Sequence, residues 1–180
     1  MSKTIGVISD THGLLRPEAV EALRGCDLII HAGDVGTPDI LEQLRQLARV
    51  VAVRGNVDNG SWALSLPSTS VTHFEGFAIH VRHILSDVMP VPNRIDAVVH
   101  GHSHKPAVEH RRGVLYLNPG SAGPRRFHLP ITVARVSVVD SRLSAQIVDL
   151  GATPVWDHGD YASRRAVPSI RRRMRRPGGG

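Results

Sequence analysis

The sequence Ile5-Gly6-Val7-Ile8-Ser9-Asp10-Thr11-His12-Gly13 contains a short apolar run followed at once by a carboxylate, an imidazole and a glycine. The run 5–8 is typical of a buried strand. Because alternate residues of an extended chain project to the same side, Asp10 and His12 are expected to point the same way. An oxygen and a nitrogen donor held two residues apart suit a divalent metal ion. Taken alone, this short pattern is explained equally well by an aspartate turn beside a solvated histidine.

Four further apolar runs also end in side chains that can bind a metal ion. These runs are 29–33 before Asp34, 50–53 before Asn56, 77–82 before His83, and 97–99 before His102 and His104. Solvated turns do not require Asp, Asn and His at every one of these positions. The shared pattern therefore indicates a single site assembled from strand ends.

Length and composition indicate one globular domain. The chain has 180 residues, 41% of them hydrophobic and only 4% aromatic, so its core is expected to be mainly aliphatic. No run approaches the roughly 18 apolar residues of a membrane helix. The first strand also begins too early to leave room for a signal peptide. Cys26 stands alone and is interpreted as a small apolar residue, so a reducing, cytoplasmic location is expected.

Positive charge is concentrated at the C-terminal end. The formal net charge is +6, and seven arginines with two aspartates in 151–180 contribute +5 of it. We expect a folded domain at 1–150 and an Arg-rich C-terminal extension at 151–180 that is disordered at its end. Arginines in 171–176 predict weak, salt-dependent contact with nucleic acid. No aromatic residue lies among them, so base stacking is not indicated.

The order of predicted elements indicates an α/β fold. Helical periodicity at 16–24 and 39–47 separates the first three strands. Alternation of strand and helix favours parallel pairing with right-handed crossovers. The second half has a hairpin signal at Glu75-Gly76 and is expected to be mostly antiparallel. Its later strands are expected at 114–117, 131–139 and 143–150. We predict two mixed sheets packed face to face, with helices outside.

The donors at the predicted strand ends favour a pair of metal ions. These donors are Asp10, His12, Asp34, Asn56, His83, His102 and His104. Seven side chains without a thiolate do not suit a structural zinc site, but they fit two divalent ions that share one carboxylate. Mixed imidazole and carboxylate ligands suit Mn, Fe, Zn, Ni or Co better than Mg or Ca. Two such ions can activate a bridging hydroxide for in-line attack on phosphorus, which makes phosphoester hydrolysis the expected chemistry.

These segments resemble the metal motifs of the calcineurin-like metallophosphoesterases, and in particular their small single-domain, YfcE-type phosphodiesterase branch. The motifs are Asp10-Thr11-His12, Gly33-Asp34, Gly55-Asn56, His83 and Gly101-His102-Ser103-His104. The resemblance covers residues 3–150. It implies a four-layer α/β/β/α sandwich of two mixed sheets with flanking helices. It also implies a divalent-metal-dependent phosphodiesterase that works by attack of a metal-bridging hydroxide.

The resemblance also implies a role for each donor. One ion would be held by Asp10, His12, Asp34 and His104, and the other by Asp34, Asn56, His83 and His102, with Asp34 bridging. Asp10, Asp34, Asn56 and His102 are implied to be catalytic. Manganese is the expected ion, with Ni, Zn, Fe, Co and Mg as alternatives. His80 is an alternative to His83, but it has the parity of the opposite strand face.

Residues after the last strand-end motif are candidates for contact with substrate. Asn118 lies on a loop that the family places near the site, where it would contact substrate or hydrogen-bond a neighbouring group. Arg125 follows this loop and is expected to bind a substrate phosphate, with a solvated basic turn as the alternative. His31 and His100 directly precede motif residues and are expected to point away from the site.

Val57 departs from the family pattern. Relatives usually have His or Cys directly after the asparagine, and valine can neither donate a proton nor bind an oxyanion. Substrates with good leaving groups are therefore expected, with metal-bound water or Asp58 as possible replacements for the missing acid.

Two other classes of function remain open. One is a catalytically weak, metal-binding scaffold or interaction protein of the same fold. The other is a phosphoesterase that acts on nucleic acid with help from the Arg-rich extension. The expected substrate is a small phosphodiester or nucleotide-type molecule, without a membrane partner. The hairpin edge near Glu75-Gly76 offers a surface for a homodimer.

Overall fold

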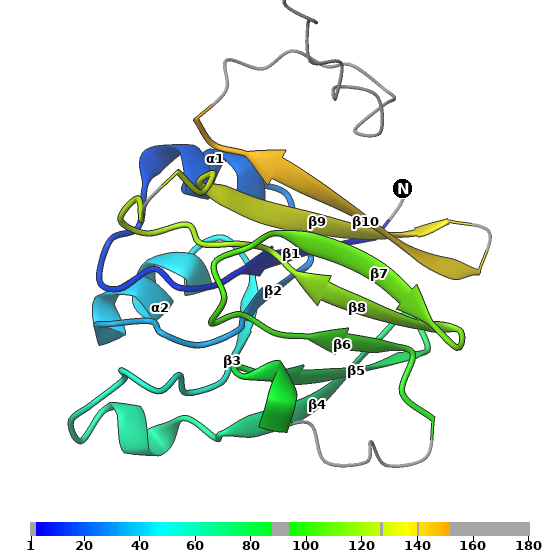
Figure 1. Cartoon of the computed structure of the whole chain (residues 1–180), viewed down its shortest axis with the longest axis horizontal. Coiled ribbons are helices and arrows are strands. Elements are labelled where there is room, and N and C mark those ends of the chain that lie inside the picture. The colour runs from blue at the N-terminus through cyan, green and yellow to red at the C-terminus, as the bar shows by residue number, and fades with distance from the viewer. Residues whose placement is uncertain (1–2, 88–93, 127, 140, 152–180) are drawn as a thin grey trace, which may run out of the picture.

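The chain folds into two five-stranded sheets packed face to face (Figure 1). The structure is a computed structural model, and it describes residues 3–87, 94–126, 128–139 and 141–151. Two mixed sheets in an α/β fold were predicted, and this is confirmed. The Arg-rich extension lies outside the described residues from position 152 onward. The boundary at residue 150 and the disordered end therefore stay predictions.

The first sheet has the strand order β10-β9-β1-β2-β3. Its strands are β1 (Thr4–Ile8), β2 (Leu28–His31), β3 (Arg49–Ala52), β9 (Thr132–Val139) and β10 (Arg142–Asp149). The first three strands pair in parallel, as their alternation with helices predicts, and β9 and β10 add an antiparallel edge. Parallel pairing places the carboxyl ends of β1, β2 and β3 at one edge of the sheet.

The second sheet has the order β4-β5-β6-β8-β7. Its strands are β4 (Thr69–Phe74), β5 (Phe77–Arg82), β6 (Ala97–Val99), β7 (Ala107–Arg111) and β8 (Val114–Asn118). The predicted hairpin joins β4 and β5, and both turn residues, Glu75 and Gly76, have positive φ. Sequence reasoning missed β7, because this mostly exposed edge strand has no clear buried face in its sequence.

Strand alternation divides the core into two parts. Ile5 and Val7 of β1 face the second sheet and meet Ile79 and Val81 of β5 in the core between the sheets. Ile8 points the other way and packs in a second cluster beneath the helices. The two sheets are therefore joined by a continuous aliphatic layer, as the low aromatic content requires.

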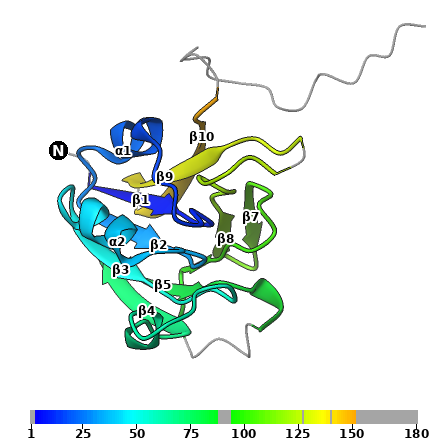
Figure 2. The same cartoon turned by 90° about the vertical axis from the view of Figure 1, so that its left-hand side faces the viewer.

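Both α-helices cover the outer face of the first sheet (Figure 2). They are α1 (Pro17–Leu23) and α2 (Pro38–Arg45), and each begins with a proline, whose missing N–H is not needed at that position. Gly6 lets α1 approach closely, since a Cβ there would lie 2.5 Å from the Leu23 side chain. Burial raises the pKa of the neighbouring Cys26 thiol, in accord with a packing role.

The four-layer expectation also places helices on the outer face of the second sheet. Within the described residues, no α-helix lies on it. The only other helical segments described are the single turns η1 (Ala63–Ser65) and η2 (Leu85–Asp87). The described part of the β5–β6 connection, 83–87 and 94–96, contains only η2, which is too short to form a helical layer. No described helix is long and apolar enough to span a membrane.

Candidate metal centre

Six of the seven predicted ligands form two groups of three. The first group contains Asp10, His12 and His104, and the second contains Asp34, His83 and His102. Within each group the potential ligand atoms all lie within 4.8 Å of one another. The seventh residue, Asn56, joins the second group, with its Oδ1 atom 3.0 Å from Nε2 of His83. Residues up to 94 positions apart in the sequence are thus brought to one place.

The strand ends hold these groups by extending the sheet hydrogen bonds into the loops. In the first sheet, the Asp10 N–H donates to the Gly33 carbonyl at 3.0 Å and the His12 N–H to the Asp34 carbonyl at 2.9 Å. In the second sheet, the Gly101 N–H donates to the His83 carbonyl at 2.9 Å. The loops that carry the ligands are therefore tied to one another across neighbouring parallel strands.

The first group contains a buried oxygen that lacks a partner. Oδ2 of Asp10 accepts hydrogen bonds from the Ser9 hydroxyl at 2.6 Å and the His102 N–H at 3.1 Å. Oδ1 lies 3.1 Å from Nε2 of His104 and 3.9 Å from Nε2 of His12, yet it makes no hydrogen bond with any described residue. A buried carboxylate oxygen without a partner is costly. A cation between these three ligand atoms would remove that cost, so the group fits a divalent ion.

In the second group, His83 presents one ring nitrogen to two oxygens. Its Nδ1 lies 2.8 Å from the Ala32 carbonyl, which fixes a proton on that nitrogen. Nε2 then faces Oδ2 of Asp34 at 3.3 Å and Oδ1 of Asn56 at 3.0 Å. Burial alone would lower the pKa of His83, but the Asp34 carboxylate outweighs it and raises the pKa. The same negative field that favours a proton on Nε2 favours a metal cation there.

Asp34 lies between the two groups. Its Oδ2 is 3.3 Å from Nε2 of His83 and 4.0 Å from Nε2 of His12, and its Oδ1 accepts a hydrogen bond from the Val57 N–H at 3.0 Å. Burial opposes ionisation, but the interactions with His83 and Val57 dominate and lower the pKa of Asp34. Asp34 is therefore an ionised carboxylate within reach of both groups.

Five of the seven ligands have left-handed backbone conformations. The φ angles are 55° at Asp10, 47° at His12, 54° at Asp34, 67° at His102 and 57° at His104. Such conformations are unfavourable for residues other than glycine and concentrate at functional sites. The abrupt strand ends turn the chain there, so that successive loops face the same small volume.

Two motif glycines allow the backbone to approach the carboxylates. A Cβ at Gly55 would collide with the backbone nitrogen and the carboxylate of Asp34. One at Gly101 would collide with the hydroxyl of Ser9 and lie 2.7 Å from Oδ2 of Asp10. Sequence reasoning named these glycines only as parts of motifs and did not single out Ser9, because its contact with Asp10 is invisible without the turn.

Asn118 lies beneath the loop that carries His102 and His104. It is 1% exposed, and its side-chain NH₂ donates to the Gly101 carbonyl at 2.9 Å and to the Ser103 hydroxyl at 3.0 Å. These bonds support the loop, and contact between Asn118 and substrate stays a prediction.

The two neighbouring arginines at the Asn118 loop face different surroundings. The Arg125 guanidinium lies close to Gly151. If Gly151 carried a Cβ atom, that atom would lie 3.3 Å from Nη2 of Arg125. Its proposed binding of a substrate phosphate stays a prediction. Arg126 lies near His104, whose pKa is lowered first by burial and further by this positive charge.

The remaining histidines near the motifs occupy packed positions. His31 is fully buried, with Nε2 2.9 Å from the Thr11 hydroxyl and Nδ1 accepting from the Gly33 N–H at 3.2 Å. Burial lowers the pKa of His31 to about 4, so the ring is neutral. His100 is also buried, with a pKa lowered by burial. His80 lies on the strand face opposite to His83, paired with Val71 and Val98, as its parity predicted.

Asp58 does not replace the acid that Val57 lacks. Its Oδ1 accepts a hydrogen bond from the Gly36 N–H at 2.8 Å, and its Oδ2 accepts one from the Gly55 N–H at 2.8 Å. The carboxylate is buried and braces the loop that carries Asn56. The Val57 side chain itself is 42% exposed beside Asn56.

Two groups of potential metal ligands thus lie at the strand ends of two facing mixed sheets. Residues 4–141 match the family described as the calcineurin-like phosphoesterase superfamily domain, and the chain belongs to this family. The resemblance predicted from the motifs is thereby confirmed.

Relatives of this family were found by sequence and by structure. A probable metallophosphoesterase of Methanocaldococcus jannaschii is 37% identical over 163 residues, covering 81% of this chain and 81% of the relative. Phosphodiesterase YfcE of Escherichia coli K12 is 30% identical over 139 residues, covering 63% of this chain and 76% of the relative. A solved structure described as a novel archaeal phosphodiesterase has the same fold, with a TM-score of 0.68 and 21% identity over 81% of this chain and 99% of that one.

Proposed function

We propose that this chain is a divalent-metal-dependent phosphodiesterase with a binuclear centre. The observation that carries the proposal is the position of Asp34, whose Oδ2 lies within 4.0 Å of both His12 and His83. An ionised carboxylate between two ligand groups is the arrangement that two metal ions sharing one ligand require. The phosphodiesterase names of two of the relatives support a diester substrate.

The donor set also supports a particular class of ion. When bound, two such ions would acidify a shared water to supply the nucleophile and would neutralise charge on the phosphate. Mixed imidazole and carboxylate ligands suit transition metals better than Mg or Ca, and we propose Mn²⁺ as the ion, with Ni, Zn, Fe, Co and Mg as alternatives.

The chain's own residues prepare this site. Ser9 and the His102 N–H hold Asp10 so that Oδ1 faces the ligands of the first group. The Ala32 carbonyl fixes the ring of His83 with Nε2 toward Asn56 and Asp34. Asn56 and His102 are both exposed and form the open side, where a phosphate would enter. Held ligands and an open face suit a hydrolase that binds its substrate from solvent.

The leaving group must depart without a proton from residue 57. Val57 has no acidic proton, and both oxygens of Asp58 accept backbone hydrogen bonds. Substrates whose leaving group is stable as an anion, such as aryl or nucleotide diesters, are therefore proposed to react fastest.

The test compares bis-(p-nitrophenyl) phosphate with p-nitrophenyl phosphate. Metal-stripped protein is refilled with Mn, Ni, Zn or Mg, and His104→Ala is measured beside the exposed control His110→Ala on β7. Metal-dependent hydrolysis of the diester, lost in His104→Ala and kept in His110→Ala, is the expected result. If two ions bind but neither ester is hydrolysed, the enzymatic proposal is wrong.

A second candidate is a metal-binding interaction protein of the same fold. One observation favours it, namely that neither Val57 nor Asp58 can act as a general acid. The same experiment separates the two, because a scaffold would bind the ions and leave both esters intact.

The partners remain part of the proposal. We take a small phosphodiester or nucleotide-type molecule as substrate in the cytoplasm. We propose that the arginines at 171–176 contact nucleic acid weakly. We also propose that a homodimer forms through the hairpin edge at Glu75-Gly76. Deleting 164–180 should leave turnover of small esters intact, and loss of turnover would overturn the peripheral role of this extension.

A further inference from the structure

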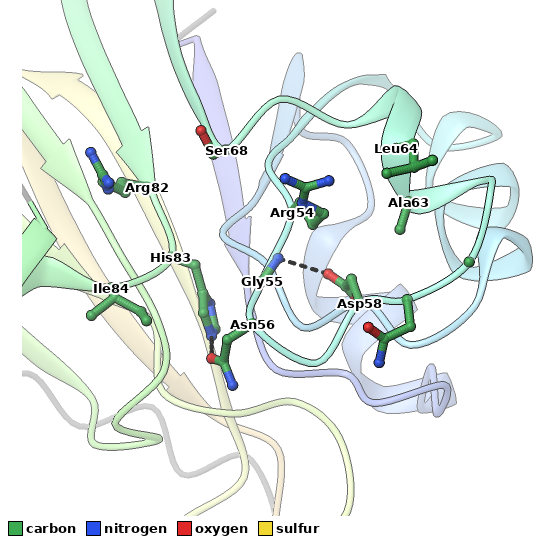
Figure 3. A pocket seen from close by; sticks show the side chains of 12 residues that line it. Arg54, Gly55, Asn56, Asp58, Ala63, Leu64, Ser68, Arg82, His83 and Ile84 are labelled. Carbon is green, nitrogen blue, oxygen red and sulfur yellow. Dashed lines mark hydrogen bonds between the residues drawn. The ribbon is translucent and has the colours of Figure 1, made fainter.

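A pocket of about 450 Å³ opens beside the second ligand group (Figure 3). Asn56 and His83 are among its lining residues, so the pocket adjoins the proposed metal centre. Its other walls come from the loop after β3, from the η1 region and from the end of β5. The volume is that of a site for a small organic molecule. A phosphodiester held at the ligands would therefore place one of its two substituents here.

The pocket contains a guanidinium that has no partner among the described residues. Arg54 lies two residues before Asn56 and is half-buried in the pocket wall. In the part of the chain that the structure describes, its side chain makes no hydrogen bond or ion pair. Figure 3 shows Arg54 on the side of Gly55 away from Asn56. An anion bound by Arg54 would thus be separate from the phosphate at the metal ligands.

Charged side chains of both signs line the described part of the pocket. Arg82, at the end of β5, is a second arginine in the lining. The one carboxylate in the lining, Asp58, is buried and has both oxygens bonded to backbone N–H groups of Gly36 and Gly55. The Asp58 carboxylate is thus engaged within its own loop, and the Arg54 guanidinium is suited to attract an anionic group of the substrate.

The pocket also has an apolar wall. Leu64 of η1 is 75% exposed and Ala63 lies beside it, whereas Ile84 lines the pocket on the far side of His83 (Figure 3). An exposed leucine beside a concave site is suited to the body of an organic substituent, such as a sugar with its base or an aryl ring. The pocket therefore combines a surface for an apolar body with a binding group for an anion.

We infer that this pocket selects phosphodiesters in which one substituent bears a second phosphate, and that Arg54 binds this phosphate. The inference rests on the proposed function, because it takes the scissile phosphate to lie at the two ligand groups. Arginine is suited to this role, since its planar guanidinium can bind two phosphate oxygens at once. The substituent lies along Leu64. The substrate class is thus a nucleotide-type diester with a further phosphate on the nucleoside.

A pair of matched substrates tests the inference. Both are 5′-(p-nitrophenyl) esters of thymidine 5′-phosphate, and one of them bears an added 3′-phosphate. The Mn²⁺-loaded protein is expected to show a kcat/KM about tenfold higher for the 3′-phosphorylated ester, the effect of one charge-assisted hydrogen-bonded contact. In Arg54→Gln this ratio should fall close to one, and in Arg54→Lys part of it should return. Arg142→Gln, at an exposed position of β10, should keep the full ratio.

A binding measurement gives a readout that does not depend on turnover. Calorimetry on the Mn²⁺-loaded protein compares thymidine 3′,5′-bisphosphate with thymidine 5′-monophosphate. Tighter binding of the bisphosphate, lost in Arg54→Gln, supports the inference even if no ester is hydrolysed, in which case only the proposed function fails. If the esters are hydrolysed but the 3′-phosphate changes neither kcat/KM nor affinity, the inference is overturned and the proposed function stands.

Discussion

The backbone N–H of His102 donates to Oδ2 of Asp10 at 3.1 Å, and this bond joins the end of β6 in one sheet to the end of β1 in the other. The Ser9 hydroxyl donates to the same oxygen at 2.6 Å. One oxygen of Asp10 is therefore held by the protein, while the other, Oδ1, is left facing His12 and His104. The orientation of this ligand is set by the fold before any ion binds.

Replacing Ser9 with alanine should weaken metal binding without removing a ligand. The Asp10 carboxylate would lose its shorter hydrogen bond and could rotate away from His12 and His104. Loss of a bond that orients a ligand typically costs about 10–100-fold in metal affinity. We expect a loss of about tenfold for Ser9→Ala, measured by competition with a chromogenic chelator. Ser144→Ala, exposed on β10, is the control, and equal affinities in the two variants would contradict this role.

Asp10→Asn and Asp34→Asn should differ in metal stoichiometry. Asp10 lies in the first ligand group only, so Asp10→Asn should bind about one ion per chain where the native protein is expected to bind two. Asp34 lies within reach of both groups, so Asp34→Asn should weaken both ions. Elemental analysis of protein dialysed against Mn²⁺ measures the difference. Identical stoichiometry in the two variants would mean that Asp34 does not bridge.

Val57→His should increase the turnover of diesters with poor leaving groups. The Val57 side chain is 42% exposed next to Asn56, so a larger side chain can be accommodated there. A positioned general acid contributes roughly 10²–10⁴-fold. An imidazole introduced without optimised support should give about tenfold on a diester of two alcohols, in which every leaving group is an alkoxide, and little gain on bis-(p-nitrophenyl) phosphate. Val57→Phe controls for size, and an equal gain in both variants would exclude acid catalysis as the cause.

The stability of the metal-free protein should fall between pH 6.5 and about 4 because of His31. The folded-state pKa of His31 is lowered to about 4 by burial, whereas an unfolded chain has the ordinary value of 6.5. Between pH 6.5 and about 4, the His31 imidazole is therefore protonated in the unfolded state but neutral in the folded state. The contribution of His31 to the free energy of unfolding is fully present above pH 6.5 and is lost as pH falls through 4. The loss is on the order of 3 kcal/mol.

Urea unfolding at a series of pH values, with a chelator present, measures this loss. His31→Gln keeps a donor toward Thr11 but cannot titrate, so its unfolding free energy should depend less on pH in this range. Parallel pH profiles for the native protein and the variant would show that another group is responsible.

The sequence alone predicts a donor side chain most readily where that side chain directly follows an apolar run. Every predicted ligand lies at a strand end, because parallel strands must place their carboxyl ends together. The structure places His83, which strand parity separates from His80, beside Asn56 and Asp34, and its role as a metal ligand stays a prediction. These features depend on local periodicity, which a sequence records directly.

Other features depend on contacts between distant segments. The short bond from Ser9 to Asp10 and the bracing of Gly36 by Asp58 arise only after the chain has turned back on itself. The edge strand β7 has no clear buried face, and the pocket around Arg54 is formed by three separate segments. No periodicity in the sequence encodes such features.

The left-handed backbone at His12, His102 and His104 has a consequence for how this family can change over time. Each such residue costs about 1–2 kcal/mol relative to glycine, and the net stability of a domain is only about 5–15 kcal/mol. Exchanging these histidines for glycine would thus strengthen the fold while it destroyed the ligand groups. A descendant released from selection for chemistry would be free to gain stability at these positions. The fold would then be kept after the activity is lost, as a more stable domain that binds partners.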